Sequence, residues 1–318
     1  MYFCSGLIRY IIMIIRKKEN WFRMLFIWQG SVLPRLLPRL SLLFILSLGI
    51  VYFHGTLFSY KVPLNPVPFT LFGFVLALFL GFRNNVSYER FWEGRKLWGA
   101  LLNVSRSLTR QALTLGKGLD KESTRYFVNL IGAFIVSLKH QLRSTDALED
   151  LRSRLSESDC DIVSKSKYKP AVILKLLGQW VQRSKEQGNI DSIQQARFDE
   201  NLDRLSDILG GCERILSTPI PYSYQVLLHR TVYIYCLLLP FGLVDSLSWF
   251  TPFLVVFIAY TFVAFEAIAD EIEEPFGQEP NDLALNSMGN MIEETIAELI
   301  GNEPEKALKS EATVKVVD

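Results

Sequence analysis

The chain has 318 residues, of which 49% are hydrophobic and 21% are charged, and its formal net charge is +1. A mean hydropathy of +0.20 is high for a soluble protein of this length, and the mixture predicts apolar membrane spans joined to a water-facing part. The near-zero net charge gives no broad positive field, so we expect no nucleic-acid partner.

The first residues of the chain carry two candidate start methionines. The stretch Met1–Ile12 is apolar, but no small-residue cleavage site follows it, so it does not have the features of a signal peptide. Met13 is the second candidate, and three basic residues follow it at positions 16–18. The pattern favours Met13 over Met1 as the true start, and we leave Met1–Ile12 out of the fold prediction.

Four apolar stretches predict four membrane-spanning helices: Leu40–Phe53, Val67–Phe82, Val226–Val244 and Phe250–Ala269. A bilayer core needs roughly 20 helical residues. The first stretch (extended to about Leu57), the third and the fourth reach or approach that length. The second stretch has 16 residues, which make about 24 Å of helix. It is short for a helix that faces lipid and acceptable for one that lines a water-filled axis.

Basic residues near the span ends predict the topology. They are concentrated before the first span, whereas the Phe58–Pro66 link carries one lysine and the Asp245–Trp249 link carries neither lysine nor arginine. Because positive charge near span ends stays in the cytoplasm, we expect the N-terminus inside and both short links outside. The long middle region, Arg83–Gln225, and the C-terminus are then cytoplasmic.

The middle region is predicted to be helical. Apolar residues recur about every 3.6 positions in Tyr88–Leu115 and Glu122–Leu142, and Ala171–Glu186 and Asp191–Leu216 follow as further helices. The segment Arg143–Tyr168 is charged and rich in serine, which predicts a surface loop with one short helix. No strand-type alternation appears, so the predicted class is all-α.

The predicted organisation has four parts: 13–82 with the N-terminal segment and the first two membrane helices, 83–225 as a cytosolic helical region, 226–269 with the last two membrane helices, and 270–318 as a cytosolic C-terminal segment. The sequence lacks the motifs of nucleotide-binding proteins, serine hydrolases and zinc proteases. Its four cysteines are far apart, and no histidine has a partner at metal-ligand spacing. We therefore expect no enzyme activity, no cofactor and no metal site.

The second apolar stretch carries two parallel stripes. Small residues recur every four positions, and large apolar residues recur one position later: Gly73, Ala77 and Gly81, and Phe74, Leu78 and Phe82. Small residues let helices approach closely in lipid, and the large residues beside them could form apolar collars around the axis of a symmetric ring, which gate ions by dewetting. Ordinary packing against lipid and other helices has the same spacing, so the pattern alone leaves both interpretations open.

Seven short blocks resemble the signature of the bacterial bestrophin family, and they run in family order from about Met13 to Gly301. These blocks are Trp28–Leu33, Phe79–Asn85, Tyr88–Glu93, Leu97–Gly99, Leu209–Arg214, Thr218–Pro221 and Glu274–Gly277. The resemblance implies a homopentameric channel with four membrane helices per subunit, a large cytosolic helical region and a pore along the fivefold axis.

The resemblance also assigns roles to single residues. In the family, three apolar residues spaced by four on the second membrane helix form the narrow neck, and the matching positions here are Phe74, Leu78 and Phe82. Gly73, Ala77 and Gly81 would pack beside that neck. A second constriction, at the cytosolic exit, matches Ile193. For Ile193 the alternative is the buried face of an amphipathic helix, which is typical of a lone aliphatic residue in a polar stretch.

A calcium clasp follows the Pro-Phe-Gly motif in animal bestrophins, and this chain departs from that pattern. Glu279 and Asp282 remain, but the other positions of the segment Gln278–Leu283 carry no carboxylate. A calcium ion needs six or more oxygen ligands, so we interpret the pair as a remnant and expect no metal site. The acidic cluster at 270–274 is expected to be the solvated cytoplasmic end of the fourth span.

The sequence thus predicts a pentameric channel for small monovalent ions in the inner membrane of a bacterium, with several spans and both termini cytoplasmic. Closely similar bacterial members of the family favour cations, so we expect Na⁺ or K⁺ to be conducted. A chloride channel of the bestrophin type and a membrane scaffold that conducts no ions are the two alternatives. The expected partners are four further copies of the chain, the lipid bilayer and monovalent ions.

Overall fold

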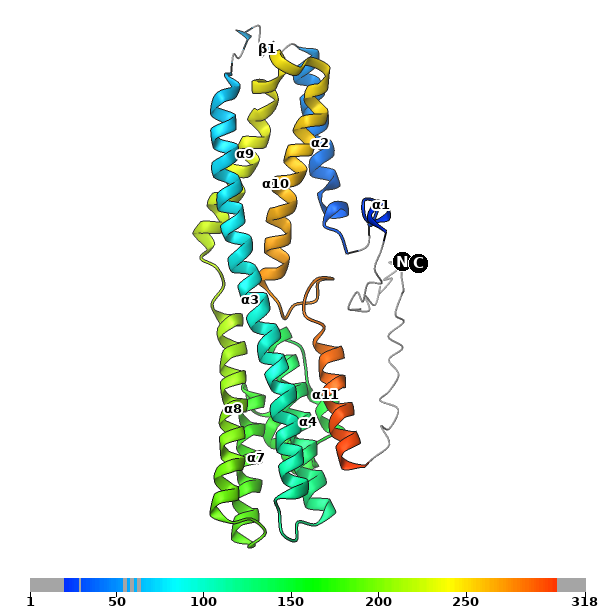
Figure 1. Cartoon of the computed structure of the whole chain (residues 1–318), viewed down its shortest axis with the longest axis vertical. Coiled ribbons are helices and arrows are strands. Elements are labelled where there is room, and N and C mark those ends of the chain that lie inside the picture. The colour runs from blue at the N-terminus through cyan, green and yellow to red at the C-terminus, as the bar shows by residue number, and fades with distance from the viewer. Residues whose placement is uncertain (1–19, 29, 54–55, 58–59, 62–63, 302–318) are drawn as a thin grey trace, which may run out of the picture. The chain divides into compact units, whose positions relative to one another are not determined.

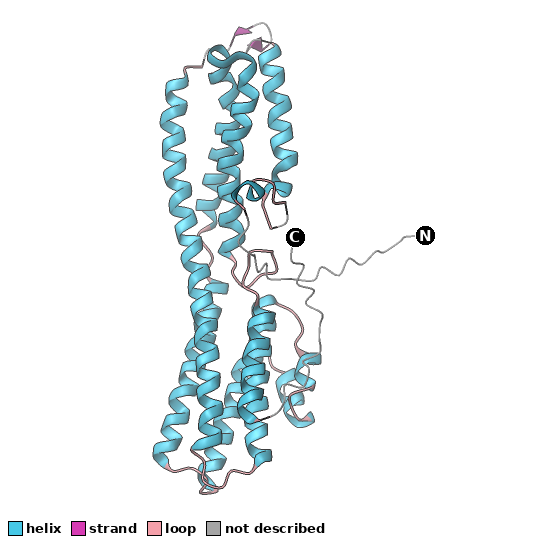
Figure 2. Ribbon diagram, turned by 45° about the vertical axis from the view of Figure 1, so that its right-hand side comes forward, coloured by secondary structure: helices cyan, strands magenta, loops and turns pink. Residues whose placement is uncertain are grey.

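The computed structural model describes residues 20–28, 30–53, 56–57, 60–61 and 64–301, so both candidate start methionines lie outside the described residues. The described chain is helical nearly throughout (Figure 1, Figure 2). Its only strands are two-residue segments, β1 (Thr56–Leu57) and β2 (Tyr60–Lys61), which pair antiparallel. The all-α prediction is confirmed.

The helices of the described residues are, in chain order, α1 (Trp21–Met24), α2 (Leu33–Tyr52), α3 (Pro66–Thr114), α4 (Lys121–Arg143), α5 (Leu148–Arg152), α6 (Glu157–Ser164), α7 (Lys169–Glu186), α8 (Ser192–Ser217), α9 (Tyr222–Leu247), the 3₁₀ turn η1 (Ser248–Phe250), α10 (Thr251–Glu273) and α11 (Leu285–Ile300). The cytosolic helices predicted from periodicity correspond to α4, α7 and α8. Their observed ends lie within two residues of the predicted ends.

Two predictions about element boundaries need correction. The apolar stretch Val67–Phe82 and the helix predicted at Tyr88–Leu115 are parts of one helix, α3, of 49 residues. The residues between them contain no proline or glycine to end the helix. The segment Arg143–Tyr168 contains two short helices rather than one. The second, α6, begins at a serine cap, where Ser156 Oγ accepts a hydrogen bond from the Asp159 backbone N–H at 3.2 Å.

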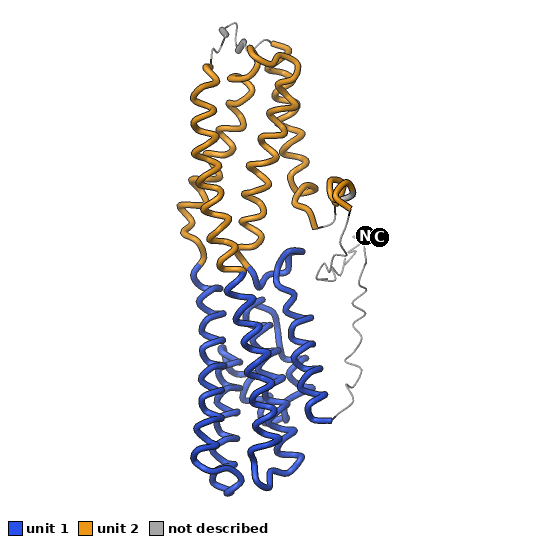
Figure 3. Tube along the Cα trace, in the orientation of Figure 1, with its two compact units in different colours: residues 1–15, 92–218, 275–318 blue, residues 16–91, 219–274 orange. Residues whose placement is uncertain are grey.

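The chain divides into two compact units (Figure 3), and α3 runs through both of them. Unit 2 comprises residues 16–91 and 219–274 and holds α2, the first part of α3, and the α9–η1–α10 hairpin. Unit 1 comprises the remaining described residues and holds the rest of α3 together with α4 to α8 and α11. The four-part division expected from the sequence stays a prediction.

Unit 2 has an apolar interior made by four helical segments. Helix α10 packs along α2 and α9, and the buried residues of the interior come from all four segments: Leu36, Leu40, Leu43, Leu76, Leu80, Val232, Cys236, Ala259, Val263 and Ala264. Outside this interior the helices expose many large apolar side chains. Such a surface suits a lipid or protein environment rather than water.

Within the part of the chain that the structure describes, three helical stretches are long and apolar enough to cross a membrane: Leu33–Tyr52, Pro66–Thr114 and Tyr222–Glu273. The third stretch contains two helices, α9 and α10, joined by η1. At the junction Ser248 has a positive φ of 45°. The chain reverses direction there, and α10 packs back along α9. The apolar window within α3 is only 17% buried, so most of its side chains face away from its own chain.

Unit 1 is a helical bundle with α4 at its centre. Helix α4 packs against α7, α8, α5 and α11 and begins at Asp120, whose side chain accepts a hydrogen bond from the Ser123 backbone N–H at 2.6 Å. Three aromatic rings from α4, α7 and α8 pack together inside the bundle. Phe127 stacks on Trp180 with ring centroids 4.1 Å apart, and Phe198 meets both rings edge-on. These contacts fix the positions of α7 and α8 against α4.

A cluster of charged side chains lies at the C-terminal end of α4. Asp150 Oδ2 lies 3.3 Å from Lys139 Nζ and 2.9 Å from His140 Nε2. Burial alone would raise the pKa of the Asp150 carboxyl, but the hydrogen bond with His140 and the positive charge of Lys139 outweigh burial and lower the pKa. The carboxylate is therefore the form that the fold favours.

Candidate functional site

Helix α3 presents two opposite faces within unit 2. Successive residues of an α-helix are turned by about 100°, so Leu76, Leu80 and Arg83 share one face, and all three are buried against the other helices of the unit. The predicted neck residues lie on the opposite face. Phe74, Leu78 and Phe82 expose 64%, 46% and 59% of their surface, respectively.

The exposure of the neck residues does not by itself distinguish a pore from a lipid contact. Val67, Leu71 and Phe79 on α3 are exposed to a similar extent. The fold does show which way the stripe points. One face of α3 packs against the other helices of unit 2, so the predicted neck stripe on the opposite face is free to contact molecules outside the chain. The role of the stripe in a pore stays a prediction.

The three small residues beside the neck have different surroundings. A Cβ atom added at Gly73 would lie 2.9 Å from Tyr235 Oη of α9, so Gly73 leaves room for the Tyr235 side chain against α3. Gly81 has nothing within 4 Å of such a Cβ, and Ala77 is exposed. The packing role of Ala77 and Gly81 beside a pore therefore needs a partner from outside the chain and stays a prediction.

Ile193 lies at the start of α8 and is 74% exposed. The turn before it is held by a capping box, in which Asp191 Oδ1 accepts from the Gln194 backbone N–H at 2.8 Å and Gln194 Oε1 accepts from the Asp191 backbone N–H at 2.9 Å. The alternative interpretation of Ile193 as a buried residue of an amphipathic helix is wrong within this chain. Its role as an aperture residue stays a prediction.

The loop after α10 does not fit a calcium ion. Asp282 Oδ2 accepts a hydrogen bond from the Glu279 backbone N–H at 2.7 Å, so this carboxylate already closes a turn. The guanidinium of Arg143 donates to the carbonyl oxygens of Phe276 and Leu283 at 3.3 and 3.5 Å. A positively charged side chain thus binds the oxygens of the loop, and the described residues contain no group of three or more metal-ligating side chains.

The arginine of this loop is itself partly desolvated. Burial lowers the pKa of Arg143, and the nearby Asp282 carboxylate offsets part of that effect. Arg143 comes from α4, so α4 and the loop are tied to each other inside unit 1.

The expectation that the acidic end of α10 is solvated is wrong for Glu273. Glu273 is only 3% exposed, and its side chain faces Arg83, which is 1% exposed. Arg83 Nη2 lies 3.5 Å from Glu273 Oε2, and it also pairs with Asp270, whose side chain is 56% exposed. The periodicity of α10 did not reveal the pair because its partners are 190 positions apart in the chain.

A second ionisable contact lies in the apolar part of unit 2. His229 Nδ1 is 2.7 Å from Glu266 Oε1, and Glu266 is buried. Neither Arg83 nor Glu266 is among the site residues that the sequence predicts. The available signal was a charged residue within or directly after an apolar span, which is costly in a membrane and is commonly functional.

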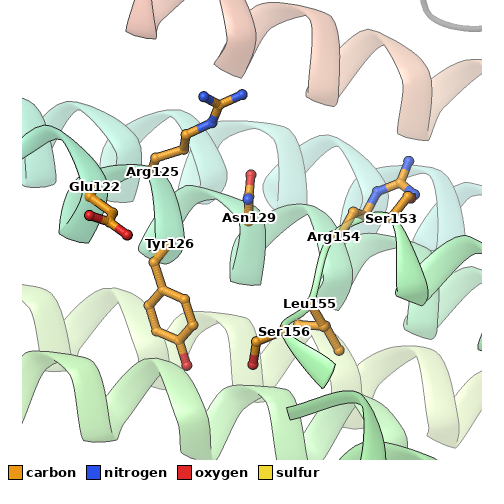
Figure 4. Close-up of a pocket in the computed structure, with 8 residues that line it drawn as sticks. All are labelled: Glu122, Arg125, Tyr126, Asn129, Ser153, Arg154, Leu155 and Ser156. Carbon is orange, nitrogen blue, oxygen red and sulfur yellow. The ribbon is translucent and has the colours of Figure 1, made fainter. Parts of the chain in front are cut away.

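Unit 1 also has a shallow polar cavity of about 270 Å³ (Figure 4). Tyr126 Oη and Ser156 Oγ both donate to Asp159 Oδ2, at 3.0 and 2.7 Å, and Arg154 Nε pairs with Glu293 at 2.8 Å. Burial, followed by the charge of Asp159, raises the pKa of Tyr126. None of the predicted pore residues is among those that line it: Glu122, Arg125, Tyr126, Asn129, Ser153, Arg154, Leu155 and Ser156.

The chain is similar in sequence to known proteins over most of its length. The model of the Bacterial/Fungal Bestrophin protein family matches residues 13–298. A voltage-dependent anion channel-forming protein of Ralstonia nicotianae is 51% identical over 304 residues, which cover 95% of this chain and 98% of that relative. A protein of the same description from Salmonella typhi is 39% identical over 281 residues, covering 88% and 92%.

A solved structure is similar over most of the chain. The crystal structure of a bacterial bestrophin homolog from Klebsiella pneumoniae superposes with a TM-score of 0.82 at 40% identity and covers 85% of this chain and 100% of that chain. The apolar helices long enough to cross a membrane, the family match and these relatives lead to one conclusion. This chain belongs to the bacterial and fungal bestrophin family.

Proposed function

We propose that this chain is one subunit of a homopentameric ion channel in the inner membrane of a bacterium. Four helical segments cross the membrane: α2, the first part of α3, α9 and α10, with both termini in the cytoplasm. The neck is formed by Phe74, Leu78 and Phe82, and Ile193 forms the aperture at the cytosolic exit.

The observation that carries this proposal is the direction of the neck stripe on α3. The three apolar side chains lie opposite the face that packs in unit 2 and are exposed on the single chain. A ring of copies gives such a stripe a common axis to face, and apolar rings of this kind control ion passage by dewetting. The description of the relatives as channel-forming proteins supports the same function.

The conducted ion is proposed to be an anion such as chloride. The names of the relatives describe anion channels, so they favour the chloride alternative over the cation preference that we expected from the sequence. The three neck side chains carry no formal charge, so the neck contains no ion pair that would select the sign of the ion. The charge preference then depends on the full path of the assembled ring.

Purified protein reconstituted in planar bilayers under a KCl gradient tests both parts of the proposal. A reversal potential near the equilibrium potential of chloride is the expected result, and one near that of potassium would overturn the anion proposal. A matched control is Leu42→Ala, because Leu42 is an exposed apolar residue of α2 outside the predicted pore, and its currents should equal those of the wild type. An intact oligomer that passes no current would instead support the scaffold alternative.

A further inference from the structure

A buried arginine directly follows the last predicted neck residue on α3. The guanidinium of Arg83 contacts two carboxylates of α10, Asp270 and Glu273, and this set of three residues is called the Arg83 clamp below. Phe82 precedes Arg83 in the sequence and points about 100° away around the helix. The clamp therefore holds α3 at the level of the neck.

Glu273 connects the clamp to two further parts of unit 2. Its Oε1 accepts a hydrogen bond from the Ile220 backbone N–H at 3.1 Å, and its Oε2 accepts one from Gln225 Nε2 at 2.8 Å. Ile220 lies in the turn before α9, and Gln225 lies in the first turns of α9. One carboxylate thus joins α3, α9 and α10 within unit 2.

A buried ion pair such as the clamp is weak evidence for a gain in stability. Arg83 Nε is buried and forms no hydrogen bond among the described residues. Leucine residues occupy the same face one and two turns earlier, at Leu80 and Leu76, so an apolar residue at position 83 would continue that packing. Replacing a buried ion pair by apolar residues is often neutral or stabilising, so stability alone does not explain an arginine at this position.

Direction is what a charged contact adds to an apolar one. Leu76 and Leu80 hold α3 against the other helices, but apolar burial is non-directional and permits small rotations. A guanidinium hydrogen-bonded to a carboxylate has a defined geometry and resists rotation of the helix that carries it. Because Phe82 is the adjacent residue, a rotation of α3 about its own axis at this level would turn the Phe82 ring.

We propose that the Arg83 clamp positions the neck, because it fixes the rotation of α3 and with it the direction in which Phe82 points. Arg83 is a positioning residue, since its buried side chain lies on the face of α3 opposite the neck stripe and does not touch the ion path. This inference rests on the proposed channel function. Under this proposal, the width of the neck depends on an ion pair on the side of α3 that faces away from the pore.

Three variants separate positioning from stability and from charge. Arg83→Lys keeps the positive charge but replaces the planar guanidinium, whose Nη2 contacts both carboxylates, with a shorter side chain that ends in a single ammonium. Arg83→Met removes the charge and leaves Glu273 as a buried carboxylate without its cation. The double variant Arg83→Met with Glu273→Gln removes both buried charges, and the glutamine retains an oxygen that accepts from Ile220 N–H.

Each variant is purified in detergent and measured for oligomer mass, melting temperature and single-channel conductance in planar bilayers. Arg83→Met should melt at a lower temperature than the wild type, and the double variant should recover most of that loss. In both Arg83→Lys and the double variant the single-channel conductance should shift by about twofold or more, because the neck is no longer held in one orientation. The control is Arg204→Met, which breaks an exposed pair with Glu200 on α8 and should leave conductance and melting temperature unchanged.

The outcomes distinguish the clamp from the channel itself. If the wild type passes no current, the proposed function fails and the clamp proposal fails with it. If the wild type conducts but the double variant regains both the stability and the conductance of the wild type, the clamp is a structural pair only. If Arg83→Lys conducts as the wild type does while the double variant differs, the effect comes from charge and the positioning role is refuted.

Discussion

Replacing Ile193 with alanine distinguishes an aperture residue from a core residue, because the two roles affect different measurements. Ile193 is 74% exposed, so only about a quarter of the free energy of burying an aliphatic side chain, about 0.4–0.8 kcal/mol, is lost on truncation. Alanine also has the higher helix propensity, which offsets part of this loss near the start of α8. We expect an almost unchanged melting temperature.

The matched control is Ile208→Ala on the same helix. Ile208 is 4% exposed, and truncating such a residue costs about 2–5 kcal/mol. At roughly 2–4 °C per kcal/mol, this corresponds to a decrease in Tm of about 4–20 °C. Thermal unfolding in detergent therefore should separate the two variants clearly.

Single-channel recording completes the test. Ile193→Ala should change the conductance or the ion preference, because the narrowest apolar ring determines how far an ion must shed water. Ile208→Ala should leave the conductance of the folded protein as it is in the wild type. A large decrease in Tm for Ile193→Ala together with normal currents would refute the aperture assignment.

The remaining predictions concern the neck, the assembly, a cytosolic ion pair and calcium. Truncating Phe74, Leu78 and Phe82 together to alanine should raise single-channel conductance, because a wider collar dewets less readily; unchanged currents from an intact oligomer would reduce these residues to packing. Light scattering in detergent should give the mass of five chains, and a stable monomer or dimer would exclude a ring. The melting temperatures of the wild type and Asp150→Asn should differ near neutral pH and converge as the pH falls below about 4. A carboxyl with a lowered pKa contributes stability above its unfolded pKa of about 3.9 and loses that stability as the pH falls through the folded pKa. Melting temperatures that stay equally far apart at every pH would contradict this. Calcium chelation should leave the currents unchanged, since Arg143 binds the oxygens of the loop after α10. Currents that depend on calcium would contradict this.

Much of the fold was predictable because its signals are local. Apolar runs identified α2, the first part of α3, α9 and α10, and periodicity identified α4, α7 and α8 to within two residues at each end. The continuity of α3 does not follow from composition, because the sequence changes from apolar to polar after Phe82 while the helix continues. A helix ends where its backbone is broken or capped, and the polar residues after Phe82 do neither.

The candidate site was predictable only in part. The spacing of the two stripes and the family resemblance placed Phe74, Leu78 and Phe82 on one side of a helix, and the structure leaves that side exposed. The buried state of Glu273 was not predictable, because four neighbouring acidic residues look solvated when their partners are unknown.

The sequence by itself determined the all-α class, the apolar spans and the family, because each depends on composition or spacing within short segments. Only the tertiary structure decided which face of α3 is packed, that Arg83 meets Glu273, that Arg143 binds the loop after α10 and that Ile193 is exposed. These facts depend on residues far apart in the chain. The free energy of a buried charge or an exposed apolar group is set by the neighbours that folding brings to it.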